Sequence, residues 1–178
     1  YQDEDANMWI GTYDGLHLYN GKNTFVFRME LDNEFSLCSN IVLEIAPAEK
    51  GYLWVATSLG INKFSLRERR VVESYMQYVD VENIASDSEG NTVLFSGEDF
   101  ITCYRPGRAF FEDVYIPGVR AAEIVAVWSE APRVFCTLGR DGELVRYRLN
   151  DGEGKRLVRV SGRQLSARPV RKAFFNGG

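Results

Sequence analysis

Histidine, cysteine and long apolar runs are scarce in this 178-residue chain. Its single histidine and its three scattered cysteines offer neither the spacing of a zinc site nor a close redox pair, so we predict no metal and no cofactor. The residues concerned are His17, Cys38, Cys103 and Cys136. The longest purely apolar run, Ile124 to Trp128, falls far short of the roughly 20 residues that a membrane-spanning helix needs. Tyr1 to Asp5 is acidic and polar, which is not the pattern of a secretory signal peptide.

Charge is distributed unevenly along the chain. Residues 1–90 carry 7 basic and 15 acidic side chains, whereas residues 91–178 carry 14 basic and 10 acidic ones. Five arginines lie between Lys155 and Lys172 with no acidic residue among them. Because the isoelectric point is near 5.2 and no RNA-binding motif is present, we interpret this stretch as a solvated face and expect no nucleic-acid partner.

One phrase of twelve residues occurs twice without a gap. Met8 to Tyr19 aligns with Leu53 to Phe64, which places Trp9 and Trp54 in the same slot, 45 residues apart. Self-similarity at a fixed period of this size is typical of repeat architectures.

Two weaker copies follow. Residues 84–104 repeat the turn and the apolar slots with Val93 in the tryptophan position, and residues 134–147 do so with Phe135. The period is therefore about 39 to 45 residues. This length is that of a four-stranded propeller blade and exceeds that of a leucine-rich repeat.

Each copy consists of short β-branched and aromatic runs separated by turn dipeptides, and helical periodicity is almost absent. These turns are Asp14-Gly15, Asn20-Gly21, Glu89-Gly90 and Asp141-Gly142. Several runs are apolar at successive positions, so both faces of their sheets must be covered. We therefore predict an all-β β-propeller of about four four-stranded blades, which is either a closed four-bladed ring or, as we favour, a fragment of a larger ring.

We expect a single partial propeller over residues 1–178. Its blades are placed at about 1–40, 41–80, 81–118 and 119–162, with 163–178 as the start of a further blade or a closing strand. The first blade lacks its inner strand, and Pro169 to Phe175 either closes a four-bladed ring in that place or begins a fifth blade. The expected strands include Val71 to Tyr78, Phe110 to Tyr115 and Ala122 to Trp128.

The first copy carries a distinctive pattern: an acidic turn and Asn7, then Met8 to Thr12, then Gly15-Leu16 and Tyr19. It resembles the two-component regulator propeller repeat, and the second copy matches nearly as well. The resemblance implies a periplasmic sensor region, the extracytoplasmic part of an inner-membrane protein. It implies detection of a glycan-derived oligosaccharide and signalling to a histidine kinase, receiver and DNA-binding module. None of those modules has its sequence in this chain.

Family members usually carry two seven-bladed propellers, so the resemblance implies that about four blades form only part of a ring. Exposed blade faces and edge strands pair readily with other chains. We therefore expect self-association, such as a homodimer.

Loops that join second to third strands gather on one face of a propeller, and here they carry polar and aromatic side chains suited to a hydroxylated ligand. The predicted ligand-binding residues are Tyr13, Asp14, Ser58, Glu98, Asp99, Arg140 and Asp141. The repeated residues are assigned to packing and turns instead. They are Trp9, Gly11, Thr12, Gly15, Trp54, Thr57, Gly60 and Phe135.

Two other functions use the same fold. One is a protein-interaction scaffold, in which the arginine-rich tail meets a protein partner. The other is a carbohydrate-active enzyme, which requires an acid–base pair. Ser58 and Ser96 lack the Gly-x-Ser-x-Gly context of a hydrolase nucleophile, and Glu98 and Asp99 are neighbours that point to opposite faces of a strand. We therefore predict no catalytic residues and no enzyme activity.

Overall fold

A computed structural model describes residues 1–75, 81–96, 101–107, 111–114, 116, 118–150, 157–166 and 168–170. Within these ranges the chain forms fifteen strands in four antiparallel sheets, and its one helical element is a 3-10 turn, η1 (Ala121–Glu123). The predicted all-β fold is confirmed. No helix in the described part of the chain is long and apolar enough to cross a membrane.

Each sheet is a simple meander of consecutive strands. The first has three strands: β1 (Met8–Thr12), β2 (Gly15–Tyr19) and β3 (Thr24–Phe27). The second consists of β4 (Val42–Pro47), β5 (Tyr52–Thr57), β6 (Gly60–Ser65) and β7 (Arg70–Tyr75). The third consists of β8 (Val81–Ser86), β9 (Thr92–Ser96), β10 (Ile101–Tyr104) and β11 (Glu112–Asp113). The fourth consists of β12 (Ile124–Ala131), β13 (Val134–Gly139), β14 (Glu143–Leu149) and β15 (Leu157–Gln164).

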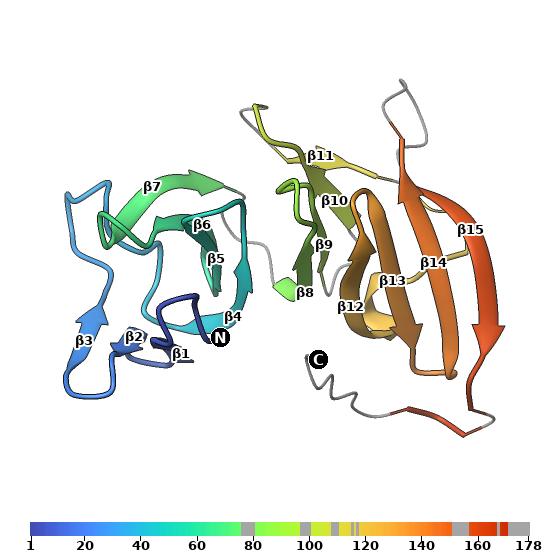
Figure 1. Cartoon of the computed structure of the whole chain (residues 1–178), viewed down its shortest axis with the longest axis horizontal. Coiled ribbons are helices and arrows are strands. Elements are labelled where there is room, and N and C mark those ends of the chain that lie inside the picture. The colour runs from blue at the N-terminus through green and yellow to red at the C-terminus, as the bar shows by residue number, and fades with distance from the viewer. Residues whose placement is uncertain are drawn as a thin grey trace.

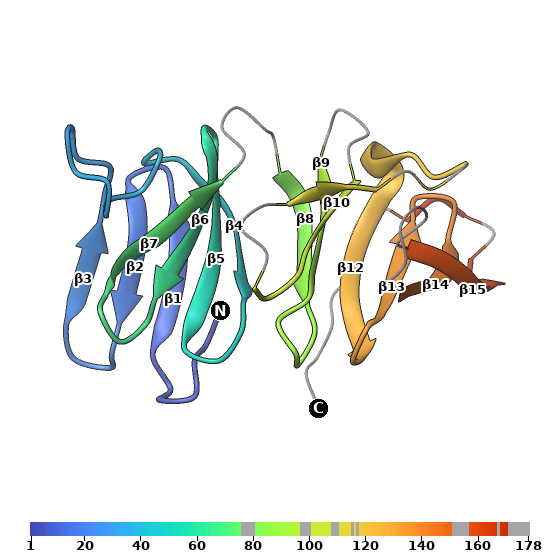
Figure 2. The ribbon, with the colours of Figure 1, turned by 90° about the horizontal axis from the view of Figure 1, so that it is seen from above.

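The four sheets follow one another along the long axis of the molecule, with β1–β3 at one end and β12–β15 at the other (Figure 1). The first strands of the last three sheets are neighbours, since β4 contacts β8 and β8 contacts β12. Figure 2 shows the strands of adjacent sheets standing side by side. The sheets therefore pack as propeller blades do, in an open row.

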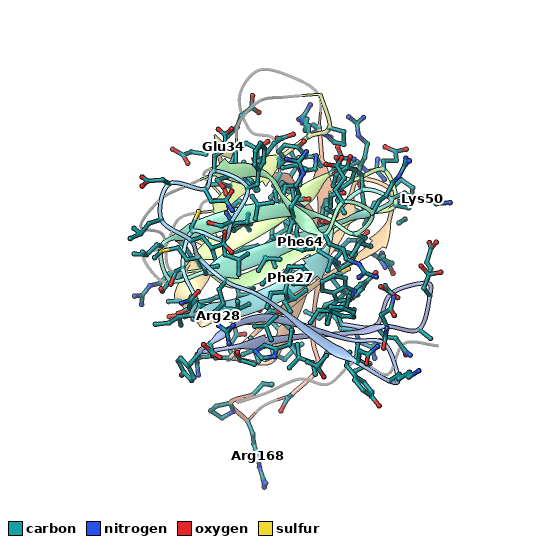
Figure 3. The ribbon with its side chains drawn as sticks, turned by 90° about the vertical axis from the view of Figure 1, so that its left-hand side faces the viewer. Phe27, Arg28, Glu34, Lys50, Phe64 and Arg168 are labelled. Carbon is teal, nitrogen blue, oxygen red and sulfur yellow. The ribbon has the colours of Figure 1, made fainter. Side chains whose placement is uncertain are left out.

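Aromatic rings fill the space between the first two sheets. Phe27 and Phe64 meet there (Figure 3), with ring centroids 5.0 Å apart. Trp9 lies 5.4 Å from the Phe64 ring and is buried together with Leu53 and Val55. Edge-to-face rings at such distances contribute packing beyond the apolar area they bury.

The structure corrects part of the strand assignment. Of the outer strand expected at Phe110 to Tyr115, the structure describes residues 111–114. Glu112 and Asp113 pair with β10, and the Val114 N–H donates to the Ile101 carbonyl (2.7 Å) before Val114 and Ile116 enter the core between the third and fourth sheets. The turn η1 precedes the fourth sheet. The strand β12 therefore starts at Ile124, two residues later than expected, and continues to Ala131. Residues 76–78 of the expected strand Val71 to Tyr78 lie outside the described residues.

Among the described residues, the free edge of β1 forms backbone pairs only with the first two residues of the chain. Tyr1 exchanges two backbone hydrogen bonds with Trp9, and Gln2 forms an isolated bridge with Met8. The segment proposed to complete this sheet begins elsewhere, because the Val170 N–H donates to the carbonyl of Arg140 in the β13–β14 turn (2.7 Å). The rest of that segment, residues 171–175, lies outside the described residues.

Candidate functional site

The turns β1–β2, β5–β6 and β13–β14 lie along one edge of the molecule, with the segments that lead into β4 and β12 (Figure 2). Backbone hydrogen bonds hold these turns to those segments. Gly15 N–H donates to the carbonyl of Asn40 (2.8 Å), and Arg140 N–H donates to that of Glu123 (2.8 Å). We call this edge the loop face, and its backbone is fixed before any ligand arrives.

The repeated threonine shapes the turns of the loop face. Thr12 Oγ1 donates to the Gly15 carbonyl (3.0 Å) and accepts from the Asp14 N–H (3.0 Å). Thr57 Oγ1 donates in the same way to the Gly60 carbonyl (2.9 Å). Gly15 has a φ of +115°, which side-chain-bearing residues rarely adopt. The repeated threonines and Gly15 therefore stabilise these turns.

The predicted ligand-binding side chains differ in their exposure and in their hydrogen-bond partners. Tyr13 is 85% exposed. Asp14 accepts from Arg28 Nε (3.0 Å) and Nη2 (2.5 Å), and this pairing lowers the pKa of the Asp14 carboxyl. Ser58 Oγ shares a hydrogen bond with Ser39 Oγ (2.9 Å). Glu98 and Asp99 lie outside the described residues.

Neither repeated tryptophan presents a ring to solvent. Trp9 and Trp54 are 2% and 0% exposed. Trp9 Nε1 donates to Asp3 Oδ2 (2.8 Å), and Trp54 Nε1 donates to Thr92 Oγ1 of the next sheet (2.9 Å). Their rings therefore pack between sheets and are not platforms for a sugar.

The last two predicted residues, Arg140 and Asp141, adjoin a cleft of about 420 Å³ between the segment around η1 and the fourth sheet. Asp141 lines this cleft, whereas Arg140 lies beside it with its backbone held at both N–H and carbonyl. The apolar wall is formed by Ile116, Val119, Ile124, Val145 and Tyr147. The charged lining is formed by Arg120, Glu123, Asp141, Glu143 and Arg159.

Opposite charges in the cleft are arranged in pairs. Arg120 Nη1 donates to Glu123 Oε1 (3.1 Å), and Arg159 Nη2 donates to Glu143 Oε1 (2.5 Å). Asp141 Oδ1 accepts from the Glu143 N–H (2.9 Å). These contacts hold the carboxylates and guanidiniums of the cleft in place.

Tyr147 and Thr137 are buried residues of this wall that carry hydroxyl groups. Burial raises the pKa of the Tyr147 phenol, and the hydrogen bond with Thr137 and the nearby Arg159 charge only partly oppose that shift. The phenol is therefore protonated at neutral pH. The cleft combines carboxylate acceptors, guanidinium donors and an apolar wall, an arrangement that can bind a hydroxylated molecule.

Sequence reasoning found Asp141 but missed the other charged residues of the cleft. Arg159 belongs to the arginine-rich stretch that we interpreted as a solvated face, and it is partnered here by Glu143. Glu123 and Arg120 stand in a connection without any repeat signal. Among the described residues, no group of histidine, cysteine or acidic side chains is placed to hold a metal ion.

Comparison with known proteins identifies the fold. No family model matches the chain, and no curated protein matches it. Among solved structures, the extracellular domain of BT4673 from B. thetaiotaomicron, described as a hybrid two-component system, superposes with a TM-score of 0.62 at 19% identity. That match covers 87% of this chain and 20% of the other.

Two further structures are similar. PorZ, a bacterial surface component of the type-IX secretion system of Porphyromonas gingivalis, gives a TM-score of 0.64 at 12% identity, covering 88% of this chain and 21% of PorZ. A chain of the mitotic checkpoint complex gives 0.68 at 8% identity, covering 94% and 51%. The chain thus spans about a fifth of BT4673 and PorZ. Likeness at such low identity establishes a shared propeller fold, which serves proteins of different roles.

Proposed function

We propose that this chain is part of the extracytoplasmic ligand-sensing propeller of a hybrid two-component regulator. Two independent observations support the proposal: the repeated phrase in the first two sheets, and the likeness to the extracellular domain of BT4673. In this proposal the chain lies on the periplasmic side of the inner membrane. It performs no catalysis, and a histidine kinase outside this chain receives the signal.

The proposed ligand is a glycan-derived oligosaccharide that binds at the loop face and enters the cleft beside η1. The observation that carries this proposal is the cleft itself, with its paired charges and apolar wall, on the edge where Tyr13 stands exposed. Sugar hydroxyls both donate and accept, so they match a lining that alternates carboxylates and guanidiniums. The apolar wall complements the less polar face of a pyranose ring.

Signalling in this proposal is a change in the geometry of the blades. The cleft is formed by two bodies, the segment around Val119 and the fourth sheet, which supplies Glu143 and Arg159. A ligand that contacts both stabilises one arrangement of that segment, which leads from the third sheet, relative to the fourth sheet. It shifts the population of arrangements by as much as its affinities for them differ.

The test is titration of oligosaccharides into the complete extracytoplasmic region by calorimetry. Tyr13→Ala, Arg140→Ala and Glu143→Gln are each expected to weaken binding about tenfold, which corresponds to the loss of one or two hydrogen bonds. Glu68→Gln is the matched control, because Glu68 also pairs with an arginine but lies at the β6–β7 turn, away from the cleft. Unchanged affinity in all three cleft and loop-face variants would refute the assignment.

Self-association belongs to the same proposal. Residues 1–40 carry 7 acidic and 2 basic side chains, whereas the described residues of 119–170 carry 4 acidic and 8 basic ones. The two ends of the row are therefore oppositely charged, which favours head-to-tail contact between copies. Light scattering of this chain is expected to give a mass above that of the monomer at low salt, falling as salt is added. A strictly monomeric chain at low salt would contradict this.

A further inference from the structure

A lysine occupies a core position of the second sheet. Lys63 pairs with Trp54 across β5 and β6, in the slot that Leu18 holds opposite Trp9 in the first sheet. Its side chain is only 6% exposed. An apolar slot that holds a charge needs partners, because an unpaired buried charge is costly.

The ammonium group of Lys63 has those partners. It forms an ion pair with Glu49 and donates a hydrogen bond to the Tyr104 hydroxyl (3.2 Å). It also lies 5.0 Å from the centroid of the Tyr52 ring. Burial alone would lower the pKa of Lys63, but the hydrogen bonds to Glu49 and Tyr104 raise it above its ordinary value. Lys63 therefore stays charged and is held rigidly.

A hollow of about 600 Å³ opens beside this lysine. Its polar side chains are Glu49, Lys63, Glu73, Ser74, Tyr75 and Tyr104, and we call it the Lys63 hollow. Two polar atoms there, Glu49 Oε2 and the Tyr75 hydroxyl, are buried without a hydrogen-bond partner among the described residues. Such atoms are rare in proteins, and each one calls for an explanation, such as a bound group.

Aromatic rings support the wall of the hollow. Tyr75 and Tyr104 stand 6.0 Å apart, and Trp54 lies 5.9 Å and 5.0 Å from them. Phe111 completes the cluster, 5.5 Å from Tyr75. Because these rings brace one another, the two phenol groups are fixed in position.

The charges of the hollow select the ligand. Glu49 already neutralises Lys63, and Glu73 adds a further negative charge at the rim, so an anion is disfavoured. A neutral molecule that offers both donors and acceptors satisfies the Glu49 carboxylate oxygen and the Tyr75 hydroxyl together. We propose that the Lys63 hollow is a second carbohydrate site, which takes a neutral sugar of one or two pyranose rings.

This site is separate from the loop face. Glu49 lies in the turn between β4 and β5, at the opposite edge of the molecule from the turns that carry Tyr13 and Ser58 (Figure 2). The inference therefore does not rest on the proposed function, and the two sites are tested by different variants.

The experiment titrates glucose, galactose, mannose and cellobiose into this chain and follows binding by ligand-observed NMR. Tyr75→Phe removes one hydroxyl and keeps the ring, so we expect affinity to fall about three- to tenfold. The midpoint of thermal unfolding without sugar should not fall, because the deleted hydroxyl has no partner among the described residues. Tyr19→Phe is the control, since the Tyr19 hydroxyl donates to the Gly21 carbonyl on an exposed strand end (2.9 Å).

Three results would overturn the proposal: no binding of any of the four sugars, equal affinity in Tyr75→Phe and wild type, or an equal loss in Tyr19→Phe. Glu73→Gln provides a second variant at the rim, and we expect it to weaken binding as well. Tyr13→Ala and Arg140→Ala should leave this binding unchanged. If they abolish it, the sugars bind at the loop face and the second site does not exist.

Discussion

The carboxylate of Asp87 connects the third sheet to the fourth. It is 5% exposed and lies in the turn between β8 and β9. Oδ1 accepts from the N–H groups of Glu89 and Asn91, both at 2.9 Å. Oδ2 accepts from Asn91 Nδ2 (2.8 Å) and from the Arg133 N–H in the turn between β12 and β13 of the fourth sheet (2.7 Å). Asp87→Ala removes all four acceptor contacts at once.

The cost follows from which donors can reach water. Hydrogen bonds to a charged group contribute about 1.5–3 kcal/mol each, and the full value is lost only where the donor stays buried. The bond from the Asn91 N–H is buried, and the bonds from the Arg133 and Glu89 N–H groups are partly buried, with Glu89 itself exposed. We therefore expect Asp87→Ala to lower the free energy of unfolding by about 3–5 kcal/mol, a large part of the ~5–15 kcal/mol typical of a domain.

The chain contains its own control for this prediction. Asp3 likewise accepts four hydrogen bonds, from the N–H groups of Asp5 and Asn7, from Asn7 Nδ2 and from Trp9 Nε1, but it is half-buried and all four donors lie within residues 5–9. Asp3→Ala should cost only about 1–2 kcal/mol. Urea unfolding followed by circular dichroism measures both variants. Equal losses, or a loss below about 1 kcal/mol for Asp87→Ala, would refute the reasoning.

Two further predictions concern Asp3 and a turn glycine. Burial raises the pKa of the Asp3 carboxyl, but hydrogen bonds from Trp9 and Asn7 lower it more, so the net shift is downward. The stability that Asp3 contributes is therefore fully present above its unfolded pKa of about 3.9 and is lost as the pH falls through its folded pKa. In acid unfolding curves, the stabilities of Asp3→Asn and wild type should therefore converge. Gly142 has a φ of +82°, and a Cβ there would lie 2.5 Å from the Ser166 carbonyl oxygen, whereas at Gly21 (φ +85°) it would meet nothing within 4 Å. Gly142→Ala should thus lower the midpoint of thermal unfolding more than Gly21→Ala, and the reverse order would contradict this reading of the turn.

The strands and turns were predictable because residues close together within each repeat determine them. A threonine and a glycine three residues apart close the turn after each tryptophan, and the Oγ1 contacts of Thr12 and Thr57 show the same chemistry twice. The tryptophan slot predicts burial because a large aromatic ring among apolar strand residues is usually buried. Such rules need only a window of about ten residues.

The segment around Ile116 shows a limit of local reasoning. Its apolar residues correctly signalled burial, but burial does not require a strand. Ile116 is buried in the core between the third and fourth sheets but belongs to no strand, whereas Glu112 and Asp113 pair with β10 and the Val114 N–H donates to Ile101. An apolar pattern fixes which side chains avoid water and leaves open whether the backbone pairs in a ladder.

Both candidate sites depend on contacts between residues distant in sequence. Lys63 is paired with Glu49 and with Tyr104, which lies 41 residues further along the chain. Arg159 is paired with Glu143 across two strands. The signal that could have pointed to Lys63 is its departure from the repeat, since it stands where the first copy has Leu18. The residues that the repeats share determine the scaffold. A charged residue in a shared apolar slot therefore marks a position whose side chain has a role other than core packing.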